Sequence, residues 1–179
     1  SCKTRCALGM IYDVIYDHLK EVREAKVGTI QCPATTSDPE HTVSQTIDKI
    51  VKNDSYDVFF KSAKTVYGTN VRELLSARHI TGMKAKPFFH PIPSVSPNDT
   101  LEKASKIISH YRTRSVPVVE NDEISGVVKS EEFLKILSKL DNRWIKSSLI
   151  FTPTPITIDQ NSSLSSARKI MTAKRIDHL

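Results

Sequence analysis

Ser115-Val-Pro-Val-Val-Glu-Asn-Asp-Glu-Ile-Ser-Gly-Val-Val128 is the stretch that decides how this chain folds. Two runs rich in β-branched residues flank the polar turn Glu120-Asn-Asp-Glu123, and this arrangement predicts a β-hairpin. Pro117 cannot donate to a strand ladder, which favours an edge or strand-start position. Apolar residues recur at helical spacing on both sides, from Leu101 to Tyr111 and from Glu131 to Leu140. The hairpin is therefore expected to lie between two helices.

A short β-prone run precedes the first of these helices. It reads Ile92-Pro-Ser-Val-Ser-Pro-Asn-Asp-Thr-Leu101, so the unit has the order strand, helix, strand, strand, helix. We expect Asp99 to be the N-cap of the helix, because Glu102 three residues later completes a capping-box pattern.

The same unit recurs along the chain. The run Ile92–Leu101 reappears as Ile156-Thr-Ile-Asp-Gln-Asn-Ser-Ser-Leu164, and the apolar helix stripe that follows it reappears as well. An earlier, weaker copy matches the middle one at a constant displacement, with Pro39, Val43, Ile50, Val58 and Gly68 corresponding to Pro97, Leu101, Ile108, Val116 and Gly126. Because no copy can bury its apolar face alone, self-similarity of this kind predicts stacked repeats.

The earlier copy is expected to form the same elements as the middle one. Thr42 and Gln45 fit a capping box, Tyr56 to Phe60 and Thr65 to Thr69 fit a hairpin, and Val71 to Ala77 fits the last helix. The first two copies are therefore expected to pack as a pseudo-twofold pair.

The third copy is expected to be truncated, because the sequence ends at Leu179, before a hairpin. We expect a strand near Ile156 to Ile158 and a helix from about Ser163 to Lys174. The apolar residues of this copy that then need cover from elsewhere are Leu164, Ile170 and Met171.

The predicted fold class is α/β (α+β), with four segments. They are an N-terminal segment at 1–26 with an amphipathic helix from about Ile11 to Lys26, repeat 1 at 27–80, repeat 2 at 84–140 and the incomplete repeat 3 at 145–179.

Composition excludes several classes of protein. A hydrophobic content of 39% and a charged content of 26% are ordinary for a globular protein. No apolar run is long enough to span a membrane, and the sequence does not begin like a signal peptide, so a cytoplasmic location is expected. Cys2, Cys6 and Cys32 lack the further ligands that zinc requires, so no metal site is expected. No nucleophile and base are paired in the sequence, which predicts that the chain is not an enzyme.

The run Ser115-Val-Pro-Val-Val119, followed by Gly126-Val-Val and an acidic helix start, resembles the cystathionine-β-synthase (CBS) domain family. The resemblance spans about Val27 to Leu179. It implies that two consecutive repeats fold face to face as a Bateman module and that such modules dimerise. It also implies a regulatory ligand, namely AMP, ADP, ATP or S-adenosylmethionine, in a cleft between the repeats, with no certain cofactor.

The family's ligand signature is a glycine, two apolar residues, Ser or Thr, two further residues and Asp. Repeat 2 reads Gly126-Val-Val-Lys-Ser-Glu-Glu132, which places Glu132 at the ribose-binding acid and Lys129 at the phosphate-binding hydroxyl. Repeat 1 reads Gly68-Thr-Asn-Val-Arg-Glu73 and is one residue shorter. An alternative remains open, because acids in the first turn of a helix are also favoured by the helix dipole alone.

The resemblance implies a set of ligand-binding residues, which are Glu132, Lys129, Arg112, Arg114, Ser96, Glu73 and Thr36. The cleft of repeat 2 is expected to be the better one, with a preference for di- or triphosphates over uncharged adenosine. Surface ion pairing is the alternative for the arginines, and turn chemistry is the alternative for Ser96 and Thr36.

The leading functional hypothesis is a ligand-sensing regulatory module that forms a homodimer. The first alternative is a dimerisation or protein-interaction scaffold without ligand. A less favoured alternative is nucleic-acid binding through the basic segment from Lys61 to Lys86, within a chain of net charge +6.

Overall fold

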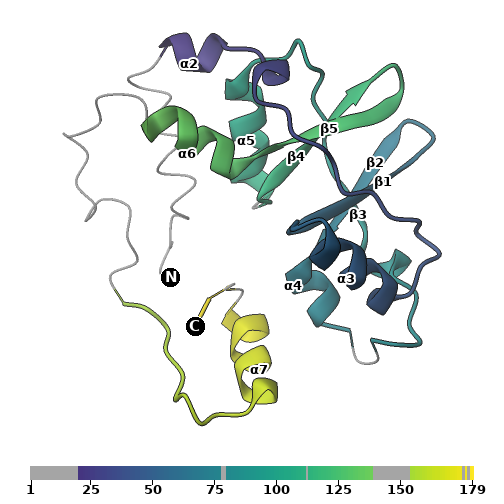
Figure 1. Ribbon diagram of the computed structural model, residues 1–179, viewed down its shortest axis with the longest axis vertical. Helices are drawn as coiled ribbons and strands as arrows, with labels where there is room; N and C mark the ends of the chain where they lie inside the picture. Colours follow the sequence, from purple (N-terminus) through teal and green to yellow (C-terminus); the bar gives the residue numbers. More distant parts are fainter. Residues whose placement is uncertain (1–19, 78–79, 112, 139–153, 175, 177) are drawn as a thin grey trace.

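The computed structural model describes residues 20–77, 80–111, 113–138, 154–174, 176 and 178–179 (Figure 1). Along them lie α2 (Lys20–Glu24), a 3₁₀ turn (Val27–Thr29), α3 (Val43–Lys52), β1 (Asp57–Ser62), β2 (Thr65–Asn70), α4 (Val71–Leu75), a second 3₁₀ turn (Lys86–Phe88), β3 (His90–Pro91), α5 (Leu101–Tyr111), β4 (Ser115–Glu120), β5 (Glu123–Lys129), α6 (Ser130–Ser138) and α7 (Leu164–Lys174). This order confirms the predicted succession of a helix, a hairpin and a second helix in both repeats.

The helix of repeat 1 begins as predicted. The Thr42 hydroxyl accepts from the Gln45 backbone N–H at 3.2 Å, and the Gln45 side chain accepts from the Thr42 N–H at 2.9 Å. This capping box satisfies two backbone donors that the first turn of α3 leaves open. The β1–β2 hairpin follows, from the pair Asp57 and Asn70 to the pair Ser62 and Thr65.

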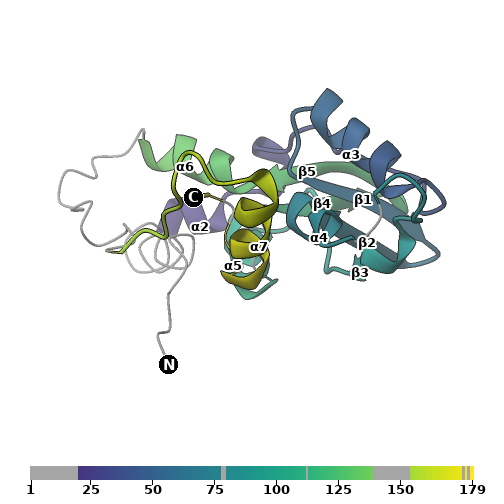
Figure 2. The same ribbon diagram turned by 90° about the horizontal axis from the view of Figure 1, so that it is seen from below.

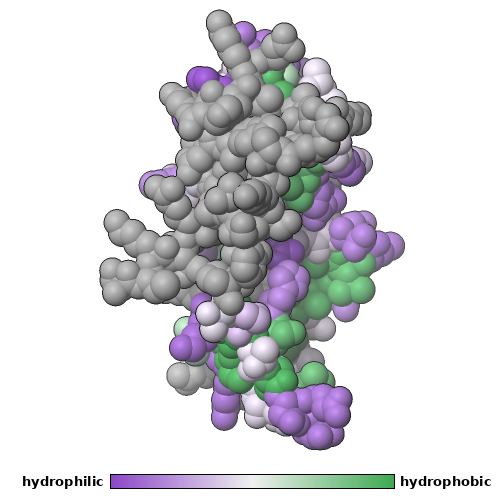
Figure 3. Space-filling view, turned by 90° about the vertical axis from the view of Figure 1, so that its left-hand side faces the viewer, coloured by the Kyte–Doolittle hydropathy of each residue, from purple (hydrophilic) through white to green (hydrophobic). Residues whose placement is uncertain are grey.

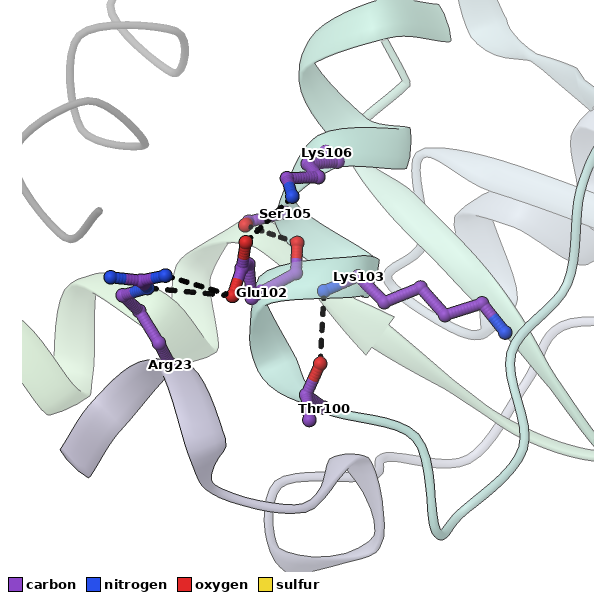
Figure 4. Close-up of polar contacts among 6 residues, drawn as sticks. All are labelled: Arg23, Thr100, Glu102, Lys103, Ser105 and Lys106. Carbon is purple, nitrogen blue, oxygen red and sulfur yellow. Dashed lines mark hydrogen bonds and ion pairs between the residues drawn. The ribbon is translucent and has the colours of Figure 1, made fainter. Parts of the chain in front are cut away.

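The helix of repeat 2 begins differently from the prediction. Thr100, not Asp99, caps α5, because its hydroxyl accepts from the Lys103 N–H at 3.3 Å (Figure 4). Asp99 instead accepts from the Ser96 N–H at 2.8 Å and pairs with Lys103. Glu102 therefore does not close a capping box. It lies between Arg23 of α2 and Lys106 of α5, at 3.3 Å and 2.6 Å (Figure 4).

The segment that leads into each repeat first lies against the other repeat. We call these two the crossing segments: one runs through Val27 and Cys32, and the other through Ala85 and β3. Before repeat 1, the Val27 N–H donates to the Asp99 carbonyl at 2.9 Å, and Cys32 pairs with Val127. Before repeat 2, the Ala85 N–H donates to the His41 carbonyl at 2.9 Å, and β3 pairs with β2. Each segment thus runs along the other repeat first. This reciprocity is the pseudo-twofold symmetry that the sequence predicts.

Each exchanged segment then returns to its own hairpin. The Ser37 N–H donates to the Phe59 carbonyl at 2.9 Å, and the Val95 N–H donates to the Pro117 carbonyl at 3.0 Å. The two hairpins lie side by side in the middle of the pair, with α3 and α4 at one end and α5 and α6 at the other (Figures 1 and 2). The crossings therefore hold the repeats together through backbone hydrogen bonds as well as side-chain packing.

The signature of repeat 1 is one residue shorter because its glycine stands one position later: Gly68 faces Phe59, and its equivalent in repeat 2 is Val127, which faces Pro117. A β-bulge before Gly126 accounts for this offset. Val119 faces Ile124 and Val118 faces Gly126, so Ser125 is an extra residue in β5. Repeat 1 has no such residue between Val66 and Tyr67. The two helix starts that follow the hairpins are therefore equivalent even though the glycines are not.

Three apolar clusters stabilise the pair. One lies within repeat 1 and includes Val43, Ile50 and Leu74, and one lies within repeat 2 and includes Leu101 and Ile108. The third joins the repeats and consists of Phe59, Val66 and Val127, with partly buried neighbours from both crossing segments. Burial of apolar area from both repeats is the main force that holds such a pair together.

The predicted N-terminal helix is described only at its end. The described part is α2, whose Val22, together with Ala25 just after it, packs against the core of repeat 2. The remainder of the prediction, from Ile11 to residue 19, lies outside the described residues.

The third copy forms its helix but not its strand. α7 spans Leu164–Lys174, within one residue of the prediction, and the Arg168 guanidinium donates to the Ala77 carbonyl at 2.8 Å. Residues 156–158 form no strand, so that prediction is wrong. In the other two copies the equivalent runs form isolated bridges to their own hairpins, Thr36 to Phe59 and Val95 to Val118, and residues 156–158 have no such bridge among the described residues.

The apolar side chains of this copy are also only partly covered by the rest of the chain. The Leu164 side chain is 90% exposed, whereas Ile170 and Met171 are half-buried. Apolar and hydrophilic patches alternate in the lower part of the face drawn in Figure 3. Leu164 is not covered within the single chain, so the cover predicted for it would have to come from another chain.

Candidate functional site

A cavity of about 140 Å³ lies where the two repeats meet. Its lining comes from repeat 1, from the segment that crosses over it and from the end of α5 in repeat 2. The lining residues are Asp57, Phe59, Gly68, Thr69, Asn70, Glu73, His90, Pro91, Ile92, Tyr111 and Thr113. A molecule bound here contacts both repeats at once.

Glu73 is the predicted site residue that lines this cavity. The Asn70 side chain caps α4 by accepting from the Glu73 N–H at 3.0 Å, which makes Glu73 the third residue of the helix. Glu132 is likewise the third residue of α6. The shorter spacing of repeat 1 therefore does not displace its acid, since Gly68 is equivalent to Val127 and not to Gly126.

Asp57 is a buried acid that the sequence reasoning missed. Its side chain is 4% exposed, and its Oδ2 accepts from the hydroxyl of Ser115 at 2.7 Å. Asp57 and Ser115 are 58 residues apart and begin equivalent strands, so they meet at the pseudo-twofold axis. One signal in the sequence could have identified it: an acid stands at the first position of a buried strand, where the other repeat has serine.

The environment of Asp57 shifts its ionisation. Burial raises the pKa of Asp57 to about 6, and the hydrogen bond from Ser115 and the charge of Arg114 oppose that rise. Arg114 itself lies over the Tyr56 ring, 3.9 Å from its centroid, and its guanidinium lies 3.4 Å from His178. A carboxylate that titrates near neutrality therefore lies between the repeats.

Thr69 is the second feature that the sequence reasoning missed. It is 4% exposed and lines the cavity, and its hydroxyl has no hydrogen-bond partner among the described residues. Val128 occupies the equivalent position in repeat 2, since Val58 faces Thr69 and Val116 faces Val128. Because Thr69 shares its strand face with Val58, its hydroxyl lies against the core of repeat 1, where a buried hydroxyl without a partner is costly.

The repeat-2 side of the pair is packed differently. Gln31 lies against Gly126, where an added Cβ would come within 2.6 Å of its side chain. Cys32 lies beside Glu132, and burial followed by the charge of Glu132 raises the pKa of its thiol. Glu132 also accepts from Lys135. On this side of the pair, the crossing segment with Gln31 and Cys32 therefore packs against the start of α6.

The other predicted site residues lie in several places. Ser96 belongs to a turn in which its hydroxyl accepts from the Asn98 N–H at 3.3 Å, and Lys129 is half-buried at the end of β5. Thr36 lines a broad open groove near the hairpin tips, together with Lys61 and Asp122.

Arg112 lies outside the described residues, and Arg114 makes the contacts given above. Among the described residues, no cluster of three or more His, Cys, Asp or Glu side chains is arranged to hold a metal ion. No helix within the described ranges is long and apolar enough to cross a membrane.

Comparison with known proteins identifies the repeat. The family model of the CBS domain matches residues 86–139. A CBS-domain-containing protein from Thermotoga maritima superposes with a TM-score of 0.57 at 20% identity, covering 66% of this chain and 98% of its own. A CBS-domain protein from Pyrobaculum aerophilum, complexed with AMP, gives 0.56 at 18% identity, covering 65% and 100%. A CBS-domain pair in complex with 5′-methylthioadenosine and S-adenosyl-L-methionine gives 0.57 at 15% identity, covering 64% and 97%.

These similarities agree with the exchanged segments and with the helix, hairpin, helix order of both repeats. They confirm the resemblance and the fold class that the sequence predicts. Residues 86–139 match the family model of the CBS domain, and the chain has the fold of a CBS-domain pair.

Proposed function

We propose that this chain is a regulatory module that binds an adenosine-containing ligand between its two repeats. The observation that carries the proposal is the cavity lined by both repeats, with the carboxylate of Glu73 at the start of a helix. Proteins of the same fold have been solved with AMP and with S-adenosyl-L-methionine, which supports this ligand class.

The geometry gives the ligand a means to act. A ligand in the cavity contacts β1, β2 and α4 of repeat 1 together with Tyr111 and Thr113 of repeat 2. Binding therefore favours the arrangement of the repeats that completes these contacts, and such a shift of populations is how a sensor passes on its state. Non-catalytic regulation fits a cavity that pairs no nucleophile with a base among its described lining residues.

Each acid is assigned a role in the proposal. Glu73 accepts from the ribose hydroxyls in the cavity, because one carboxylate can accept from two neighbouring hydroxyls. Glu132 and Lys129 form the corresponding pair on the other side, and Arg112 and Arg114 are the candidates for phosphate contact. Ser96 and Thr36 complete the set implied by the family resemblance.

Calorimetric titration with adenosine, AMP, ATP and S-adenosylmethionine tests the proposal. Glu73→Gln should weaken binding by about 1–3 kcal/mol, the cost of removing a charged hydrogen-bond acceptor. Glu131→Gln is the matched control, because Glu131 is exposed beside Glu132 in the first turn of α6. If the unmutated chain binds none of these compounds, the regulatory proposal fails.

A scaffold is the second candidate function, and exposed apolar side chains favour it. Leu164 is 90% exposed and Val51 is 75% exposed. Burial of such residues between two copies would form the homodimer that the family resemblance implies. Sedimentation of the chain at several concentrations tests this, and a monomer that also binds no nucleoside would exclude both candidates.

A further inference from the structure

One hydrogen bond joins the two repeats at the pseudo-twofold axis, beside the cavity. Asp57 begins β1 and Ser115 begins β4, and the Ser115 hydroxyl donates to the Asp57 carboxylate at 2.7 Å. The two residues are 4% and 6% exposed, so water competes little for this bond. Burial raises the pKa of Asp57 to about 6, and its carboxyl is therefore mainly ionised at pH 7.5. A buried hydrogen bond to a charged group is among the stronger ones in a protein.

The cavity touches one end of this bond. Asp57 lines the cavity, whereas Ser115 is not among the described residues that do. Thr113, a lining residue from repeat 2 that is 7% exposed, donates its hydroxyl to the Ser115 carbonyl at 2.9 Å. Ser115 thus bonds to one lining residue from each repeat, with its side chain to Asp57 and with its backbone to Thr113. A change at Ser115 therefore acts on a ligand through these neighbours rather than by direct contact.

The same bond lies between the two helix starts. Next to Asp57, the Tyr56 carbonyl accepts from the first N–H of α4 at 3.2 Å. Next to Ser115, the Arg114 carbonyl accepts from the first N–H of α6 at 2.8 Å. Each of these helices carries the signature acid of its repeat in its first turn. Backbone hydrogen bonds therefore continue from each end of the Asp57–Ser115 bond to the helix start of the same repeat.

We propose that the hydrogen bond between Ser115 and Asp57 couples the cavity to repeat 2, with Ser115 as a positioning residue for ligand binding. The proposal rests on the function proposed above and names the contact through which the bound state reaches the second repeat. A ligand in the cavity packs against Asp57 and Thr113 and restricts both. Because both are bonded to Ser115, the restriction extends to β4 and to the start of α6. Ligand binding and the order of α6 are then linked, and linkage of this kind acts in both directions.

Calorimetric titration of the full chain with adenosine at pH 7.5 is the first test. Ser115→Ala should weaken adenosine binding by about tenfold, because the unmutated chain holds the two cavity walls in place before the ligand enters and the variant must order them on binding. Ser105→Ala is the matched control, since Ser105 is also 6% exposed and its hydroxyl donates within α5, to the Glu102 carbonyl. The control should change the affinity by less than about twofold.

Replacement of Asp57 separates this coupling from direct contact with the ligand. Asp57→Asn keeps an oxygen that can accept from Ser115, so this variant should bind adenosine within about threefold of the unmutated chain. Asp57→Ala removes the acceptor, and in that background Ser115→Ala should have no further effect on the affinity. An equal loss of affinity from Ser115→Ala with and without the Asp57 side chain overturns the coupling.

Hydrogen exchange measured by mass spectrometry gives a readout that a purely structural role of Ser115 would not change, and it decides alone if Asp57→Ala does not fold. None of the described lining residues belongs to α6, so protection of α6 by a ligand must be transmitted. Saturating adenosine should slow amide exchange at the start of α6 severalfold in the unmutated chain and leave it unchanged in Ser115→Ala. Equal protection in both proteins, or none in either, overturns this inference but not the function proposed above. If the unmutated chain binds no adenosine, the proposed function fails and this inference fails with it.

Discussion

The two sides of the repeat pair are related by a pseudo-twofold axis but differ in what lies at each helix start. On the Glu73 side, the crossing segment His90–Ile92 lines a cavity with Asp57 and Thr69. On the Glu132 side, Gln31 and Cys32 of the equivalent segment pack against the helix start and the strand before it. The two repeats thus share one backbone fold, but the side chains of the crossing segments give the helix starts at Glu73 and Glu132 different surroundings.

The close approach of the crossing segment at Gly126 gives the largest expected effect. A Cβ at position 126 would lie 2.6 Å from the Gln31 side chain and 2.7 Å from the Cys32 carbonyl oxygen. Gly126→Ala should therefore reduce the free energy of unfolding by about 3 kcal/mol, because a backbone atom must move. Gly68→Ala is a comparison at a position that is not equivalent, since its closest contacts are Phe59 ring atoms of its own hairpin at 3.0 Å, and it should cost about 1 kcal/mol. Equal losses in urea unfolding would contradict the close backbone approach at Gly126.

The Asp57 carboxyl gives the second largest effect, through pH. Its folded pKa of about 6 lies above its ordinary value of 3.8, so the folded state binds the proton more tightly. Its contribution to stability therefore rises as pH falls through 6 and is complete below about 3.8. Between pH 7.5 and pH 4.5 the unmutated chain should gain about 2 kcal/mol relative to Asp57→Asn. Parallel stability curves for the two proteins would contradict the raised pKa.

A reciprocal exchange at equivalent positions sharpens the comparison further. Thr69→Val removes a buried hydroxyl without a partner and should raise the free energy of unfolding by about 1 kcal/mol. Val128→Thr places a hydroxyl in the fully buried equivalent position and should lower it by about 1–2 kcal/mol. Urea unfolding of both variants measures the pair of effects. A loss of stability in Thr69→Val would mean that its hydroxyl has a structural role.

The hairpin turns give the smallest expected effect. Ala63 has a φ of 51° at the tip of the β1–β2 hairpin, a conformation that glycine adopts without strain. Ala63→Gly should therefore stabilise the chain by about 0.5–1 kcal/mol. Lys64→Gly, at the neighbouring position of the same turn, should not stabilise it, and thermal unfolding distinguishes the two.

Much of the fold follows from the sequence because local pattern and repeat agree. The capping box at Thr42 and the two hairpins depend on neighbouring residues, and they are found as predicted. The cap of α5 was predicted from its local pattern alone. Comparison with Thr42 identifies Thr100, which occupies the same place in repeat 2.

What the sequence does not show are the contacts between distant segments. The exchange of the crossing segments brings His90, not Ser96, along β2, and no local pattern encodes that pairing. Asp57 gains its role only because Ser115 meets it at the axis. The position of the cavity on the Glu73 side depends on such contacts, which explains why the spacing of the signature alone favoured Glu132.

A crystal structure of the chain grown with adenosine tests the central claim most directly. We predict that adenosine lies in the cavity between the repeats, with its ribose hydroxyls on Glu73. Adenosine bound only beside Glu132, or only in the open groove at Thr36, would contradict that assignment.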